Sequence, residues 1–179
     1  MTPASEIGIL IHPSPIGEIV IVAQAGELLS VEPVVGDAPG TVPVHLRDRI
    51  TPLASAAPAA QTAAAQLEDY FAGRRTRFDL PLRWSGVPGF AREALRAVCD
   101  IPYGETASYG EVAVLAGRPR AARAVGTACA RTPFSVVVPV HRVIRADGSL
   151  GEYGGQPEIK RYLLDHESRF GHHSVRPEG

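Results

Sequence analysis

Cysteine is scarce in this 179-residue sequence, in which Cys99 and Cys129 are the only two. Two cysteines are too few for a disulfide framework, and the sequence contains no Cys-x-x-Cys pair of the kind that binds metals. No apolar run approaches the roughly 20 residues that span a bilayer. The first residues have no basic segment ahead of an apolar one, so we expect no signal peptide. These absences favour a soluble, cytoplasmic protein without a membrane partner.

Net charge is also nearly absent, at -1, which by itself argues against a strong nucleic-acid binder. The charges are unevenly distributed, however. Residues 1–80 contain nine acidic residues and five arginines. Residues 112–146 contain no acidic residue and six arginines, namely Arg118, Arg120, Arg123, Arg131, Arg142 and Arg145. A stretch of one sign in a neutral protein predicts an anionic partner at that surface. The alternative is a solvated basic surface without a partner.

The first half of the chain has the pattern of a small α/β domain. Apolar runs at 7–11, 18–23 and around 28–31, separated by turn residues, predict a three-stranded β-meander. Residues 33–50 are rich in Pro, Gly and Asp and predict a loop. An alanine-rich segment predicts a helix over 54–71, and a last strand is expected over 78–82.

The second half, which follows a Gly- and Pro-rich link at 85–89, predicts mainly helices. Apolar residues at helical spacing indicate an amphipathic helix over 90–100. Ser108 and Glu111 form a capping box at the start of a short helix that Gly117 ends. Pro119 suits the first turn of another helix over 119–130. Two short helices joined by a tight turn form a helix-turn-helix pattern, although many such hairpins bind nothing.

The last segments complete an α+β chain. The β-branched run at 134–138 predicts a buried strand, residues 146–155 a glycine-rich loop, and residues 157–167 a final helix. We therefore expect an N-terminal domain over 1–84, a C-terminal domain over 88–167 and a flexible tail over 168–179.

The order of short motifs resembles the O6-alkylguanine-DNA alkyltransferases, also called methylated-DNA–protein-cysteine methyltransferases. The motifs SPIG (14–17), YFAG (70–73) and FDLPL (78–82) are similar to the family's N-terminal half. The C-terminal half is similar in IPYGETASYGEVA (101–113), AARAVG (121–126), PVHRVI (139–144), GEYGG (151–155) and LLDHE (163–167). The resemblance implies a ribonuclease-H-like α/β domain followed by a mainly helical domain with a DNA-binding helix-turn-helix.

The family's Pro-Cys-His-Arg signature is altered in this chain. Val140 stands where the reactive cysteine would be, between Pro139 and His141. Alkyl transfer requires a thiolate, and valine has neither a lone pair nor an acidic proton, so self-alkylation at this position is chemically excluded. Thr132 stands where the family usually has asparagine. The resemblance transfers the remaining catalytic network to His141 and Glu167.

A DNA-binding surface is also implied by the resemblance. Tyr109 matches a tyrosine that presses on the phosphate beside the target nucleotide. Arg123 matches an arginine finger that fills the space left by the extruded base; its alternative is a plain surface charge. The remaining DNA contacts would be Ala121, Ala122, Gly126 and Arg142. The base pocket would consist of Cys129, Val140, Val143, Tyr153 and Gly154.

These features together predict a non-catalytic sensor. It would bind double-stranded DNA that contains O6-alkylguanine, flip the base and mark it for another repair protein. Two alternatives stay open. One is an enzyme on the same fold, in which His141 and Glu167 activate water or a small substrate. The other is an alkyltransferase whose acceptor cysteine was mutated to Val140.

Three further expectations concern thiols, cofactors and assembly. Cys129 is expected to be an inert buried thiol, and its alternative role is that of a relocated acceptor. Some family members bind zinc through N-terminal cysteines and histidines, but this N-terminal half has no cysteine. We therefore expect no metal and no cofactor, and we expect the protein to be a monomer.

Overall fold

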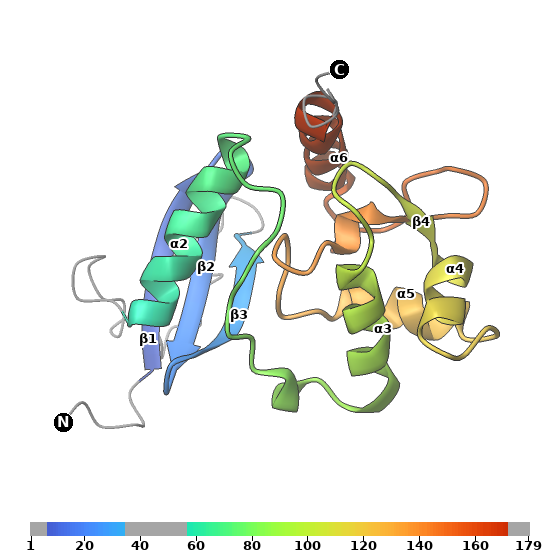
Figure 1. Ribbon diagram of the computed structural model, residues 1–179, viewed down its shortest axis with the longest axis horizontal. Coiled ribbons are helices and arrows are strands. Elements are labelled where there is room, and N and C mark those ends of the chain that lie inside the picture. Colours follow the sequence, from blue (N-terminus) through green and yellow to red (C-terminus); the bar gives the residue numbers. More distant parts are fainter. Residues whose placement is uncertain (1–6, 35–56, 172–179) are drawn as a thin grey trace, which may run out of the picture. The chain divides into compact units, whose positions relative to one another are not determined.

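The computed structural model describes residues 7–34 and 57–171, which belong to two compact units (Figure 1). The first unit contains residues 1–86 and Pro133–Val137, and the second contains Val87–Thr132 and Val138–Gly179. The chain therefore enters the second unit at Val87, leaves it after Thr132 and returns to it at Val138. Within the described residues, no helix is both long and apolar enough to cross a bilayer.

The sheet of the first unit has three antiparallel strands in the order β1-β2-β3. They are β1 (Ile7–Ser14), β2 (Gly17–Gln24) and β3 (Glu27–Pro33). Ile19, Ile21 and Ala23 are fully buried, and their alternation places them on one face of the sheet. Gly17, with φ of 100°, begins β2 in a conformation that favours glycine. The predicted β-meander is confirmed.

Helix α2 (Pro58–Phe71) lies along this sheet and packs against β1 and β2 (Figure 1). Ala60, Ala63, Leu67 and Tyr70 are fully buried and share one face at helical spacing. The helix begins at Pro58, later than predicted, because proline is well suited to the first helical turn. Most of the predicted loop over 33–50 lies outside the described residues, as do residues 54–56.

The predicted strand over 78–82 is wrong. Only Leu82 forms a bridge, with Leu28 of β3. The backbone of Asp79 is already bonded to a side chain: its N–H donates to Gln66 Oε1, and its carbonyl accepts from Gln66 Nε2, both at 2.9 Å. Pro81 has no N–H to offer a neighbouring strand. Hydrogen bonds to Gln66 of α2 therefore take the place of the strand pairing that the apolar pattern predicted. The 3-10 helix η2 (Trp84–Gly86) follows.

The predicted strand over 134–138 is also wrong. Phe134 forms a single bridge with Val31, and the chain then turns. Val136 has a φ of 70°, and the Val137 N–H donates to the Ser135 carbonyl at 2.8 Å. These values describe a γ-turn of the rare, strained kind. The β-branched run reflects burial at a reversal of the chain and not an extended strand.

The described residues of the second unit form four α-helices, one 3-10 helix and a short parallel pair of strands. The helices are α3 (Gly89–Cys99), α4 (Tyr109–Leu115), α5 (Ala122–Ala130) and α6 (Pro157–Gly171). The strands are β4 (Ala107–Ser108) and β5 (Val143–Ile144), and the 3-10 helix η3 (Val140–Arg142) precedes β5. Ala94, Leu95 and Val98 form the buried face of α3, which packs against α4 and α5.

The ends of these helices test the sequence analysis in detail. The capping box of α4 is confirmed: Glu111 N–H donates to Ser108 Oγ at 3.2 Å, and Ser108 N–H donates to Glu111 Oε2 at 2.6 Å. Helix α5 begins at Ala122 and not at Pro119, because residues 118–121 form a turn closed by an Ala121 N–H to Arg118 carbonyl bond. Helix α6 continues to Gly171, beyond the predicted end at 167.

Candidate functional site

His141 in η3 and Glu167 in α6 meet in the interior of the second unit although they are 26 positions apart. Both side chains are fully buried, and His141 Nε2 lies 2.7 Å from Glu167 Oε1. Burial lowers the pKa of His141, with Glu167 offsetting part of this effect, so the ring is neutral at pH 7. Since the carboxylate can only accept, Nε2–H is the donor, and the lone pair lies on Nδ1. Nδ1 is buried and has no hydrogen-bond partner among the described residues.

Arg142 holds the other side of the same carboxylate. Its Nε donates to Glu167 Oε2 at 2.8 Å, and its Nη2 donates to Oε1 at 3.0 Å. Nη1 donates to the carbonyl of Ile101 at 2.7 Å, and the backbone N–H of Gly104 donates to Oε2 at 3.1 Å. Burial opposes the ionisation of Glu167, but the bonds from His141 and Arg142 outweigh it and lower its pKa.

This geometry corrects the assignment of Arg142. The motif resemblance predicts Arg142 to be a DNA contact, but its side chain is only 7% exposed and its donors face Glu167 and Ile101. Its guanidinium also lies over the Tyr103 ring, 5.5 Å from the centroid. Arg142 therefore orients the Glu167 carboxylate from within the unit.

Val140, the first residue of η3, is 4% exposed and lies directly before His141. The chain turns at Pro139, where the Val140 N–H donates to the Val138 carbonyl at 2.8 Å. The Val140 side chain is hydrocarbon and offers no nucleophilic atom. Thr132, at the end of the segment after α5, is also buried.

Cys129 is half-buried in α5. Burial raises the pKa of its thiol to about 12, although the nearby Lys160 lowers it in part. At pH 7 the thiolate is therefore a negligible fraction, and only the thiolate is a good nucleophile. The environment of Cys129 favours the expected inert thiol over a relocated acceptor.

Lys160 is a residue that the sequence analysis missed. Its side chain is fully buried in α6, and Nζ donates to the carbonyl of Val143 at 2.5 Å. Nζ also lies 5.9 Å from the centroid of the Tyr109 ring. Burial lowers the pKa of Lys160 to about 8. The sequence feature that could have identified Lys160 is its spacing from Glu167, because residues 160 and 167 lie two turns apart on one face of a helix.

Tyr109 is half-buried at the start of α4 and is enclosed by two glycines. A methyl group at Gly126 would meet its ring at 3.8 Å, an ordinary contact. A methyl group at Gly151 would lie 2.8 Å from the Tyr109 hydroxyl, which no structure tolerates without movement. Gly151 thus leaves space for this hydroxyl.

The other predicted site residues lie in several environments. Arg123 is exposed on α5, and Ala121 and Ala122 are half-buried at its start. In the 146–155 loop, Tyr153 is buried and Gly154 is exposed. The arginines of the basic stretch other than Arg142 are exposed; they are Arg118, Arg120, Arg123, Arg131 and Arg145. Among the described residues, no group of three or more His, Cys, Asp or Glu side chains is arranged to hold a metal.

The comparisons with known proteins define the class. Residues 10–84 match the ribonuclease-like domain of 6-O-methylguanine DNA methyltransferase, and residues 89–169 match its DNA binding domain. The fold is thus a two-domain α+β fold, with a ribonuclease-like domain followed by a helical DNA-binding domain. The predicted fold class is confirmed.

Similar proteins are named consistently. The chain is 49% identical over 102 residues to a methylated-DNA–protein-cysteine methyltransferase of Methanosarcina barkeri, and 50% identical over 105 residues to one of Mycobacterium tuberculosis. The aligned parts span 57% and 59% of this chain but only 64% and 63% of those relatives, less than two thirds of either.

Solved structures match over a greater length. The O6-methylguanine methyltransferase of Mycobacterium tuberculosis is 36% identical, with a TM-score of 0.76 over 97% of this chain and 96% of that one. The OGT protein of that organism in complex with DNA is 37% identical, with a TM-score of 0.75 over 91% and 94% of the two chains. This chain belongs to the 6-O-methylguanine DNA methyltransferase family, as its motifs indicated.

Proposed function

We propose that this protein binds double-stranded DNA containing O6-alkylguanine, flips the modified base and leaves the alkyl group in place. The observation that carries the proposal is that Val140 lies directly before a buried His141–Glu167 pair. The motif resemblance assigns the acceptor position to this valine. The relatives' names and the DNA complex of the OGT protein support DNA as the ligand. The protonated thiol of Cys129 supports the absence of alkyl transfer.

Helices α4 and α5 provide the binding surface in this proposal, as a helix-turn-helix. Extruding a base costs a few kcal/mol, and less for a poorly paired base such as an alkylated guanine. Arg123 is exposed on α5 and would act as the wedge, while the other exposed arginines neutralise phosphates. Tyr109 would contact the phosphate beside the flipped nucleotide. Val143 and Tyr153 would line the base pocket.

A protein that leaves the lesion in place requires a second repair protein to remove it. We therefore propose that the complex acts as a signal, with the protein itself a cytoplasmic monomer that needs neither metal nor cofactor. Arg142 and Glu167 would hold His141 in place beneath the pocket. Their role is positioning, since they reach the reacting position only through the imidazole.

The decisive experiment combines binding with intact-mass spectrometry. The wild-type protein is expected to bind a duplex with O6-methylguanine more tightly than the matched unmodified duplex at fixed salt, and to gain no methyl mass. Val140→Cys is expected to gain some methyl mass, since His141 can assist deprotonation, and adding Thr132→Asn should increase the rate. Cys99→Ala, which removes the exposed thiol at the end of α3, serves as the control and should bind like the wild type. Equal affinity for both duplexes, or a methyl adduct on Cys129, would contradict the proposal.

A second candidate is a hydrolase. It is favoured by Nδ1 of His141, which has no hydrogen-bond partner among the described residues. Nδ1 would accept a proton from a water whose oxygen bonds to the alkyl carbon as the bond from that carbon to guanine O6 breaks. The products would be an alcohol and guanine, and His141 would pass the proton on to the guanine. Conversion of more than one equivalent of modified DNA, lost in His141→Asn, would select this candidate. An alkyltransferase whose acceptor cysteine was mutated would instead show full single-turnover transfer in Val140→Cys alone.

A further inference from the structure

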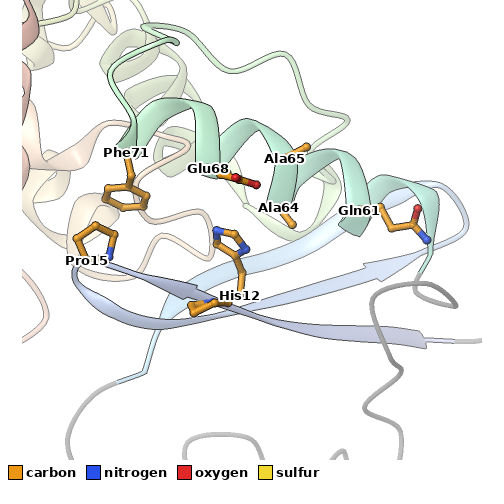
Figure 2. Close-up of a pocket in the computed structure, with 8 residues that line it drawn as sticks. His12, Pro15, Gln61, Ala64, Ala65, Glu68 and Phe71 are labelled. Atoms are coloured by element: carbon orange, nitrogen blue, oxygen red, sulfur yellow. The ribbon is translucent and has the colours of Figure 1, made fainter.

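A groove between α2 and β1 of the first unit has no role in the function proposed above. Figure 2 shows His12 and Pro15 on the strand side, facing Glu68 and Ala64 on the helix. The groove is open and has a volume of about 700 Å³. Its walls comprise two alanines of α2 together with His12, Pro13, Pro15, Gln61, Glu68 and Phe71.

The chemistry of this groove is apolar with one negative charge. Prolines, alanines and the Phe71 ring form most of the wall. Burial lowers the pKa of His12, and Glu68 offsets part of that effect, so the imidazole is neutral at pH 7. Among the described residues that line the groove, Glu68 is then the one charged side chain, and it is exposed.

An arginine or lysine side chain matches these features. Its aliphatic stem packs on apolar surface while its charged head stays at the rim. Here the stem would lie against Pro13 and Pro15, and the head would reach the Glu68 carboxylate or the face of Phe71. The volume exceeds what one side chain fills and lies in the range of pockets that bind a drug-sized ligand, roughly 300–1,000 Å³. A nucleic acid would place phosphates beside Glu68, which is unfavourable.

We propose that the α2–β1 groove binds a basic peptide segment of a partner protein, with arginine or lysine beside an apolar residue. The inference rests on the proposed function, in which another repair protein must be recruited. The groove belongs to the first unit, whereas the proposed DNA contacts belong to the second, so the two ligands use different residues. A second copy of this chain is less suitable, because its basic stretch is assigned to DNA.

The test uses the full chain and a pair of synthetic peptides. Acetyl-Ala-Leu-Arg-Leu-Ala-amide is the probe, and the same peptide with glutamate in place of arginine is its control. In NMR titrations, the arginine peptide should shift the signals of His12, Ala65 and Glu68, and the glutamate peptide should not. Glu68→Gln should weaken binding by about fivefold at most, as expected for an exposed charge pair. Asp69→Asn is the matched control, because Asp69 pairs with Arg74 and does not line the groove.

A second variant, Ala65→Arg, should block the groove, because the new side chain would fill it and carry the same positive charge as the peptide. Equal binding of both peptides, or unchanged binding in Glu68→Gln and Ala65→Arg, would overturn the proposal. Groove shifts that depend on protein concentration without any peptide would also overturn it, in favour of a second copy. Both variants should bind modified DNA like the wild type. A negative result for peptide binding in the groove is therefore distinguishable from a negative result for binding of modified DNA.

Discussion

At the scale of single residues, the proposed function depends on Val140 and its neighbours. Its neighbours provide a neutral imidazole oriented by a buried carboxylate, as a thiol would need for deprotonation. The side chain that we propose to occupy the acceptor position, Val140, is a hydrocarbon. The network nevertheless has a structural consequence, because the buried charge of Glu167 is compensated by Arg142 and accepts a hydrogen bond from the neutral His141.

Glu167→Gln is expected to destabilise the protein by about 3–5 kcal/mol, because Arg142 loses its buried counter-charge. The loss should depend on pH. The folded-state pKa of Glu167 lies below its ordinary value of 4.5, so its stabilisation is present above that pH and is lost as the pH falls below it. Urea unfolding at neutral and acidic pH measures both effects. Asp69→Asn, which breaks an exposed pair, should cost about 0–1 kcal/mol. A similar loss in both variants would contradict the assignment.

Arg123→Ala is expected to weaken binding to modified DNA more than Arg145→Ala does. Both side chains are exposed, and each carries one charge to the phosphates, but only Arg123 lies on α5 as the proposed wedge. Titration of both variants against the same duplex gives the comparison, and a fluorescent base analogue at the lesion reports extrusion. Equal affinity and equal extrusion in the two variants would rule out the wedge.

At the scale of elements, the features that the sequence predicted are those that local interactions determine. The β-meander, α3 and the capping box at Ser108 depend on neighbouring residues, and all three are present. The strand predicted over 78–82 fails because Gln66, thirteen positions away, bonds the backbone of Asp79. The same limit applies to the site. The motifs indicated His141 and Glu167, but the burial of Arg142 and Lys160 depends on distant carbonyls of Ile101 and Val143.

The glycines of the 146–155 loop allow a matched test of the position of Tyr109. Gly151 and Gly155 have φ values of 76° and 78°, so alanine at either costs about 1–2 kcal/mol in backbone strain. Only at Gly151 would the added methyl group meet the Tyr109 hydroxyl, at 2.8 Å, whereas nothing lies within 4 Å at Gly155. Gly151→Ala should therefore reduce the affinity for modified DNA, and Gly155→Ala should not. Equal affinities at equal stability would show that Tyr109 does not contact DNA.

At the scale of the whole molecule, a net charge of -1 conceals a division of charge along the chain. The stretch without acidic residues belongs largely to the second unit, and only Pro133–Val137 of it belongs to the first. The sequence could show this division but not which arginines face solvent. The structure removes Arg142 from the set, because its charge is compensated by Glu167. Five exposed arginines then remain to neutralise phosphates: Arg118, Arg120, Arg123, Arg131 and Arg145.

This count sets the expected salt dependence of DNA binding. If each of the five exposed arginines neutralises one phosphate, the slope of log K against log salt should be about -4.5. Arg118→Ala with Arg120→Ala should make the slope shallower by about 2, while the preference for modified DNA is retained. Arg74→Ala with Arg77→Ala removes two exposed charges from the first unit and should leave the slope unchanged. Anisotropy titrations at several salt concentrations measure all three proteins. An unchanged slope in the Arg118→Ala, Arg120→Ala variant would show that this part of the basic stretch is a solvated surface. A shallower slope in the Arg74→Ala, Arg77→Ala variant would show that phosphate contacts are not confined to the second unit.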